Sequence, residues 1–236
     1  MDTQNINKAR IVYYGLFAAF FSFQLSEEHL GVIDRSLAVL GEHPIDEQTA
    51  KALANMQRKL KRGGYIALTN ESDRIFYSPA RITVPMSASF YTEQKDDGAK
   101  RMEMIRYIAE SKFRRNEEAY KEQEDHIEFV FLFIRTLIEE ELQGDTNAPG
   151  LVKKIFENIL NSMVGPFCHH LMTHEDSFIY RDVALALQSF MECERLFLGI
   201  AAPQATAEDC AAEIPAERKR RIPEGFYKKK NRKECV

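Results

Sequence analysis

The chain has 236 residues, of which 44% are hydrophobic and 29% are charged, and its formal net charge at pH 7 is −4. This composition excludes global disorder, and the length allows one well-packed core, in one domain or a compact pair. The charge is unevenly distributed: residues 217–236 contain nine Lys or Arg against three Glu, so this tail is +6 and residues 1–216 carry −10. The sequence therefore combines an acidic body with a basic tail.

Helical patterns dominate the body. Residues 7–24 carry apolar side chains at helical spacing, and Ser26, followed by two acids, is typical of the N-cap of a second helix. A third helix begins at Pro44 and is expected to end at the pair Gly63 and Gly64. The predicted helices cover residues 7–24, 26–41, 44–62, 71–77, 97–114, 125–142, 149–164, 166–174 and 175–198.

The longest break in this periodicity, residues 78–97, is rich in Pro, Ser and aromatic side chains, which indicates a long functional loop. There is no internal repeat and no alternating strand pattern. We therefore predict an all-α fold, a single bundle-like domain of about eight to ten helices over residues 1–200. Residues 201–236 are rich in Ala, Pro and charge, and they are expected to form a flexible basic tail.

The cysteines and the apolar segments indicate the compartment. The four cysteines lack paired spacing, which is typical of free thiols in a reducing environment. No apolar run reaches the roughly 18 residues that a membrane span needs. Residues 11–23 could pass for a signal-peptide core, but they contain Tyr13 and Tyr14 and no small-residue cleavage site follows. We expect a cytoplasmic protein with a buried first helix and no stable membrane insertion.

An acidic cluster around one histidine, residues 122–128, runs directly into the apolar segment 129–134. That segment leaves no polar face, so its helix must be buried, with its polar N-terminal end where the core meets the surface. Asp125 beside His126 could hold guanidinium groups or form an acid-base pair. Alternatively, Asp125 is only a helix cap and His126 a surface residue. Adjacent helical residues point in different directions, which favours a binding rim over a catalytic dyad.

His170 and His174 are four residues apart and would share one helix face; zinc would need a third and a fourth ligand, of which Glu175 or Asp176 could supply one. No HExxH or paired-cysteine framework accompanies them, so a structural or exposed role is favoured. There is no phosphate-loop pattern and no nucleophile elbow. The acidic body also lacks a nucleic-acid recognition motif. We therefore predict no catalytic residue, no bound metal or cofactor, and no nucleic-acid partner.

Several segments carry motifs in a familiar order. Residues 13–21 (YYGLFAAFF) are similar to a Tyr-x-Leu-Leu-x-x-Phe opening. Residues 76–79 and 85–91 are similar to Leu-Phe-x-x-Pro and Pro-x-x-x-Ser-x-Tyr, and residues 124–127 (EDHI) to Pro-Asp-His-Leu. Residues 178–190 resemble a closing Phe-Tyr helix. In this order and spacing, across the body but not the tail, the chain resembles the TorD/DmsD/NarJ family of redox-enzyme maturation chaperones.

The resemblance implies a cytoplasmic helical chaperone that is not an enzyme. Such a protein binds the twin-arginine leader of a molybdenum enzyme and holds the catalytic subunit until molybdopterin is inserted, before export. The residues do not distinguish among trimethylamine oxide, dimethyl sulfoxide, nitrate and formate enzymes as the client. They are compatible with a monomer or with a swapped dimer.

The residues fit such a role on chemical grounds. A leader carries two arginines and then an apolar stretch, so its receptor needs carboxylates beside aromatic surface, and the guanidinium fork matches a carboxylate. Asp125 would pair with an arginine, His126 would add a hydrogen bond, and residues 85–91 would form one side of the groove. We expect Asp125→Ala to weaken leader binding by about tenfold or more while helicity is unchanged. The predicted leader-binding residues are Tyr77, Pro85, Ser89, Phe90, Tyr91, Glu124, Asp125, His126 and Glu128.

Three further hypotheses compete with or extend this one. A helical enzyme could combine Asp125 and His126 with a metal held near His170 and His174. A helical adaptor could dock on a membrane through its basic tail. Finally, residues 220–226 (RRIPEGF), a basic pair followed by apolar residues, loosely resemble the leader itself and could occupy the groove until a client displaces them.

Overall fold

The structure, a computed structural model, describes residues 3–118 and 120–203. Apart from one isolated bridge, these residues contain no β-structure, and the predicted all-α class is confirmed. The helices are α1 (Thr3–Phe20), α2 (Glu27–Glu42), α3 (Glu47–Ser72), α4 (Ala88–Glu93), α5 (Ala99–Glu110), α6 (Ile127–Leu142), α7 (Ala148–Ile155), α8 (Asn161–Thr173) and α9 (Ile179–Leu198), with π-helical segments η1 (Asp73–Tyr77) and η2 (Phe156–Leu160). The predicted basic tail, from residue 204 onward, lies outside the described residues.

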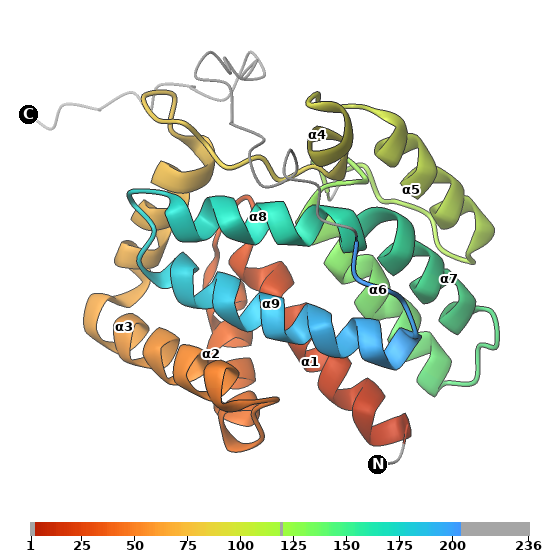
Figure 1. Cartoon of the computed structure of the whole chain (residues 1–236), viewed down its shortest axis with the longest axis horizontal. Helices are drawn as coiled ribbons and strands as arrows, with labels where there is room; N and C mark the ends of the chain where they lie inside the picture. Colours follow the sequence, from red (N-terminus) through yellow and green to blue (C-terminus); the bar gives the residue numbers. More distant parts are fainter. Residues whose placement is uncertain (1–2, 119, 204–236) are drawn as a thin grey trace, which may run out of the picture.

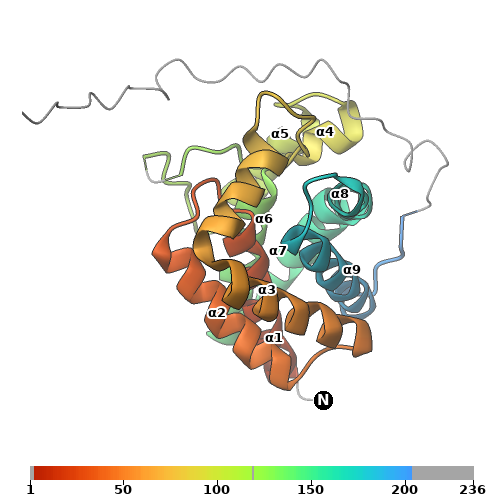
Figure 2. The ribbon, with the colours of Figure 1, turned by 90° about the vertical axis from the view of Figure 1, so that its left-hand side faces the viewer.

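Helix α6 is the apolar helix that the sequence predicted to be buried. It packs along α1 and against α7, while α9 packs against α3 and α8 (Figures 1 and 2). Val130, Phe131 and Ile134 are fully buried, and the other apolar residues of this run are largely covered. The hydrophobic run therefore forms part of the core, as its lack of a polar face requires.

The first helix is also buried, as predicted. Phe17 of α1 lies against Phe131 of α6, and Tyr13 stacks on Phe190 of α9 with ring centroids 4.7 Å apart. These aromatic contacts place α1 against two other helices of the core. No helix in the described part of the chain has the length and apolarity to cross a membrane.

A buried ion pair joins α1 to α9. The Arg10 Nε and a terminal guanidinium nitrogen donate to the Glu194 carboxylate at 2.6 and 2.9 Å, and the Tyr14 hydroxyl donates to it at 2.7 Å. Arg10 is 4% exposed and Glu194 is 1% exposed. The two-point contact and the added hydroxyl satisfy charges that would otherwise be costly to bury.

Capping side chains set the start of two helices: α2 begins after Ser26 as predicted, whereas α3 begins at Glu47 and not at Pro44 as predicted. The Ser26 side chain accepts a hydrogen bond from the backbone N of His29, and α2 begins at the next residue. The Asp46 carboxylate accepts from the backbone N of Thr49 at 2.6 Å and caps α3. Both side chains satisfy amide groups that have no partner within their own helix.

The predicted end of the third helix at Gly63 and Gly64 is confirmed, because Gly64 has non-helical backbone angles and divides α3 into two helical segments. The sequence did not predict that a second segment would follow the bend directly. Helix α3 bends there and continues to Ser72, so the predicted helix 71–77 is divided between the end of α3 and η1. Gly64 has a φ of 64°, a conformation that glycine adopts at little cost. Leu68, beyond the bend, is fully buried, and this packing favours a second helical segment over a loop.

Two further boundaries differ from the prediction. Residues 149–174 were expected to form two helices separated before Pro166, but α7, η2 and α8 follow one another directly and Pro166 lies inside α8. Phe167 and Cys168, which follow the proline, are fully buried, so tertiary packing outweighs the lost backbone hydrogen bond. The loop expected at 78–97 contains a short helix, α4.

Candidate functional site

The two segments predicted to form the site lie side by side. The backbone N of Ile127 donates to the carbonyl oxygen of Met86 at 2.8 Å, and the backbone N of Ala88 donates to that of Asp125 at 3.0 Å. An antiparallel bridge pairs Ser87 with His126 between them. Residues 85–91 and 124–128, far apart in the sequence, therefore form one structural unit.

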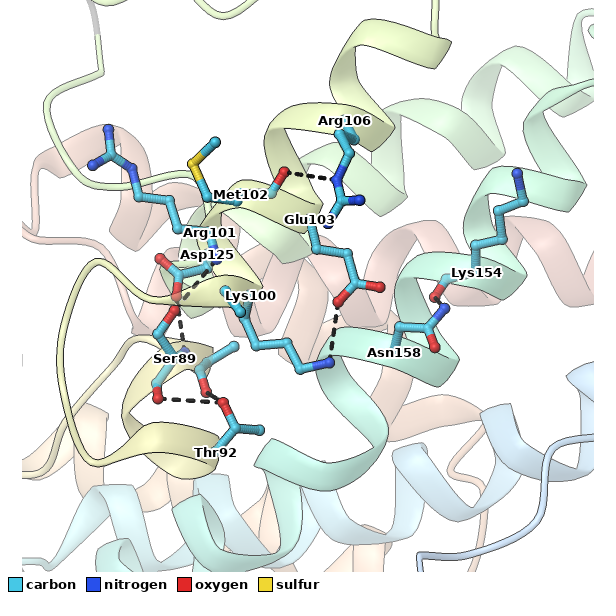
Figure 3. A network of polar contacts seen from close by, with 12 residues as sticks. Ser89, Thr92, Lys100, Arg101, Met102, Glu103, Arg106, Asp125, Lys154 and Asn158 are labelled. Atoms are coloured by element: carbon cyan, nitrogen blue, oxygen red, sulfur yellow. Dashed lines mark hydrogen bonds and ion pairs between the residues drawn. The ribbon is translucent and has the colours of Figure 1, made fainter.

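Asp125 is the buried centre of this unit. Its Oδ2 accepts a hydrogen bond from the backbone N of Ser89 at 2.9 Å, so it holds the first turn of α4 (Figure 3). The carboxylate is fully buried, and this burial raises its pKa, although the Ser89 hydrogen bonds oppose the shift. The alternative in which Asp125 caps its own helix and His126 is a surface residue is wrong, because the N-cap of α6 is His126, which is 5% exposed.

Glu124 binds two arginines. The Arg101 Nε donates to Glu124 Oε2 at 2.7 Å, and the Arg115 guanidinium donates to Oε1. Burial by itself would raise the pKa of Glu124, but the hydrogen bonds from both arginines outweigh it, so the pKa is lowered and the carboxylate is ionised. The backbone N of Arg101 also donates to Ser89 Oγ at 3.3 Å, which connects this ion pair to the Asp125 contact (Figure 3).

Glu128 belongs to a second polar cluster. The Tyr120 hydroxyl donates to Glu128 Oε2 at 3.0 Å and lies 3.3 Å from His126 Nδ1. Burial is the largest influence on Glu128 and raises its pKa to about 7, while hydrogen bonds with Tyr120, Ser22 and Phe23 oppose the shift. Near neutral pH this carboxyl therefore exists in both protonation states.

The predicted aromatic side chains are packed more tightly than an open groove would require. Phe90 and Pro85 are buried, and the half-buried Tyr91 donates from its hydroxyl to the Pro85 carbonyl oxygen at 2.8 Å. Tyr77 is also half-buried, with its ring edge-to-face against Phe23 at a centroid distance of 5.0 Å. Tyr77 and Tyr91 are thus partly exposed, and Phe90 is not.

The two histidines of the competing metal hypothesis have other contacts. The His170 ring lies beside Tyr91, with Nδ1 3.5 Å from the tyrosine hydroxyl, and His174 Nε2 lies 3.0 Å from the carbonyl oxygen of Ile82. In the described part of the chain, no three His, Cys, Asp or Glu side chains are grouped so as to hold a metal ion. The segment 220–226, proposed to occupy the groove, lies outside the described residues.

The comparison with protein families decides the class of protein. A family model described as the nitrate reductase delta subunit matches residues 42–172, which is more than half of the chain and includes every predicted site residue. The chain belongs to this family. The nitrate reductase delta family is a NarJ/TorD-type family of molybdoenzyme maturation chaperones, and the resemblance seen in the sequence is confirmed. Comparisons with curated proteins and with solved structures gave no match.

Sequence reasoning missed three residues of the site in this nitrate reductase delta family member. Arg101 and Arg115 bind Glu124, and Tyr120 joins Glu128 to His126. Periodicity does not reveal these contacts, because they depend on how the chain folds back between α5 and α6. The available signal was compositional: basic residues interrupt the acidic body just before the Glu124 motif.

Proposed function

We propose that the chain binds the twin-arginine leader of a molybdoenzyme catalytic subunit in the cytoplasm and holds the subunit until its cofactor is inserted. Membership of the nitrate reductase delta family supports the class of client. The observation that carries the leader-binding proposal is the buried carboxylate of Glu124, which already accepts hydrogen bonds from two guanidinium groups. A pair of arginines is the feature that a leader offers.

The arrangement suggests how a leader would enter. The side chains of Arg101 and Arg115 are 28% and 14% exposed, whereas that of Glu124 is 8% exposed, so the arginines cover the carboxylate from the solvent side. A leader arginine would replace one of them at Glu124 and form the same charge-assisted hydrogen bonds. The displaced arginine would return to water at modest cost, which makes the exchange reversible.

Asp125 acts differently in this proposal. Its carboxylate lies beneath Ser89 and holds residues 85–91 against the start of α6. A leader arginine would reach Asp125 only if that segment moved. We therefore propose that Asp125 and Ser89 position residues 85–91, while the partly exposed Tyr77 and Tyr91 contact the apolar stretch of the leader.

Calorimetric titration of the full chain with synthetic leaders, beginning with that of a nitrate reductase, tests the proposal. Binding should be lost when the arginine pair of the leader is replaced by alanines. Glu124→Gln should weaken binding by about tenfold or more, because it removes the charge that the arginine requires. The control Glu110→Gln makes the same change of charge at an exposed acid paired with Lys154, and binding should be unchanged.

A third variant tests whether the leader arginine competes with the arginines of the protein at Glu124. Arg115→Gln leaves Glu124 with one competitor fewer, so the leader should bind as tightly as to the wild type or more tightly. Normal leader binding by Glu124→Gln would show that the arginine site is not at Glu124. Equal affinity for the leader with and without its arginines would exclude twin-arginine recognition altogether.

A further inference from the structure

The middle of α3 is basic, although the body as a whole is acidic. Between Gln48 and Asn70 there are five Lys or Arg and no Asp or Glu. The Lys59 ammonium is paired with Asp182, but Arg58 donates to the neutral amide oxygen of Asn55. Lys61 and Arg62 lie three and four residues after Arg58, which is about one helical turn. The helix thus carries a concentrated positive charge that no acid of this segment balances.

This basic segment coincides with the bend of α3 at Gly64. Residues 61–66 are all exposed, which is unusual within a helix because one face normally packs on the core. Figure 1 shows the bend at the left-hand edge of the molecule. Ile66 is 72% exposed, and the hydroxyl of the neighbouring Tyr65 donates to the carbonyl oxygen of Leu25. A basic tip with an apolar residue at its end therefore projects from the protein.

We propose that this tip, residues 58–66, is a docking site for an anionic lipid surface. Cations attract acidic headgroups, and an apolar side chain beside them can enter the boundary between headgroups and acyl chains. A shallow hollow of about 470 Å³ is lined by the basic side chains of Arg58, Lys61 and Arg62 together with Ala54 and Gln57, and it offers several donors to a headgroup phosphate. The anionic lipid surface would repel the acidic remainder of the body, so the tip would fix the orientation of the protein on the membrane.

A lipid surface fits this tip better than a protein does. A specific protein interface needs about 800 Å² from each partner, usually around a central apolar cluster, and here the apolar part is essentially Ile66 with the edge of Tyr65. A membrane instead tolerates a small apolar insertion when basic residues surround it. Single weak contacts with lipid are reversible, and a second signal is needed for stable anchoring. The +6 segment 217–236 can supply that second signal.

The chain contains no tryptophan, so a single introduced indole reports on its own position. Ile66→Trp places this probe at the tip, and Leu196→Trp places a matched probe at an 83% exposed position near the end of α9. The full-length variants are mixed with phosphatidylcholine vesicles, with and without phosphatidylglycerol. The fluorescence of the Ile66→Trp variant should shift to shorter wavelength only with the anionic vesicles and should be quenched by brominated acyl chains. The fluorescence of the Leu196→Trp variant should not change.

Charge variants test the electrostatic part by co-sedimentation. Lys61→Gln with Arg62→Gln should weaken binding to the anionic vesicles by roughly thirtyfold, since each cation near such a surface contributes about fivefold. Lys112→Gln with Lys154→Gln makes the same change of charge at exposed lysines elsewhere and should have a much smaller effect.

Two results would overturn the proposal. The first is co-sedimentation with anionic vesicles without any spectral shift at position 66, which would assign binding to the tail or another face. The second is absence of vesicle binding, with the basic tip instead binding nucleic acid or an acidic protein. Neither result bears on leader binding, which is measured without lipid.

Discussion

The Glu128 carboxyl, in the first turn of α6, lies near residues 22–23, which follow α1, and near Tyr120, which precedes α6. Burial raises its pKa to about 7, against 4.5 for an ordinary glutamate, although hydrogen bonds with Tyr120, Ser22 and Phe23 limit the rise. Between these two pH values the folded protein keeps a proton that the unfolded chain has released. Protonation of Glu128 therefore favours folding at low pH, and this contribution is lost as the pH rises through about 7.

Glu128→Gln should remove this pH dependence, because the amide keeps the shape of the side chain and cannot ionise. The free energy of unfolding of the wild type should fall relative to that of the variant as the pH rises. The difference between the two proteins should grow by about 2 kcal/mol from about pH 5 to pH 8. Urea denaturation of both proteins at a series of pH values measures the difference, in which other titrating groups largely cancel. Parallel pH profiles would mean that Glu128 titrates at its ordinary pKa.

At the scale of elements, local chemistry predicted some helix ends and tertiary packing decided others. Ser26 and the start of α2 were predictable because a capping side chain bonds an amide three residues away. The signal at Gly64 was correct, since its non-helical backbone angles interrupt α3, although a second helical segment follows directly. The signal at Pro166 was misleading, because the buried residues beyond it stabilise a continuing helix. Helix α4 was missed because its first turn is held by Asp125, a contact that no local pattern encodes.

The candidate site shows the same division. The motif residues 85–91 and 124–128 were predicted to meet, and they do. The burial of Glu124 was not predictable, because Arg101 and Arg115 cover it from a segment whose path the sequence does not reveal. Sequence identified which residues gather, whereas the contacts that bury them, such as the Ser89–Asp125 hydrogen bond and the ion pairs of Glu124, became visible only in the structure.

The contact between α1 and α9 leads to a prediction for Glu194. Within the described residues, Glu194→Ala would leave the Arg10 guanidinium buried with the Asn7 side-chain oxygen as its hydrogen-bond acceptor and the Phe197 ring beside it, and the Tyr14 hydroxyl would lose its acceptor. The free energy of unfolding should fall by about 3–5 kcal/mol, as is typical when one member of a buried ion pair is removed. Urea denaturation measures this change.

Replacing both charged partners provides the comparison. Arg10→Met with Glu194→Leu removes both charges and fills the space with apolar atoms, so much of the stability lost in Glu194→Ala should return. A Glu194→Ala protein as stable as the wild type would show that the pair is open to water.

On the scale of the whole molecule, the matched family segment and the hydrophobic core do not coincide. Residues 42–172 begin at the end of α2 and stop within α8, so α1 and α9 lie outside the match. Yet α1 covers α6, and α9 covers α3 and α8. The aromatic core includes Phe17 and Phe21 from the N-terminal part and Tyr180 and Phe190 from α9.

A fragment of residues 42–172 should therefore fail to fold cooperatively. Without α1 and α9, the fully buried side chains of Phe131, Phe76 and Phe167 would lose their aromatic partners Phe21 and Tyr180 and meet water, and no single core would remain. Thermal unfolding followed by circular dichroism should be broad and weak for this fragment and sharp for residues 1–203, which keep every described helix. A sharp transition for residues 42–172 would instead define the matched segment as a domain that packs against α1 and α9 without needing them to fold.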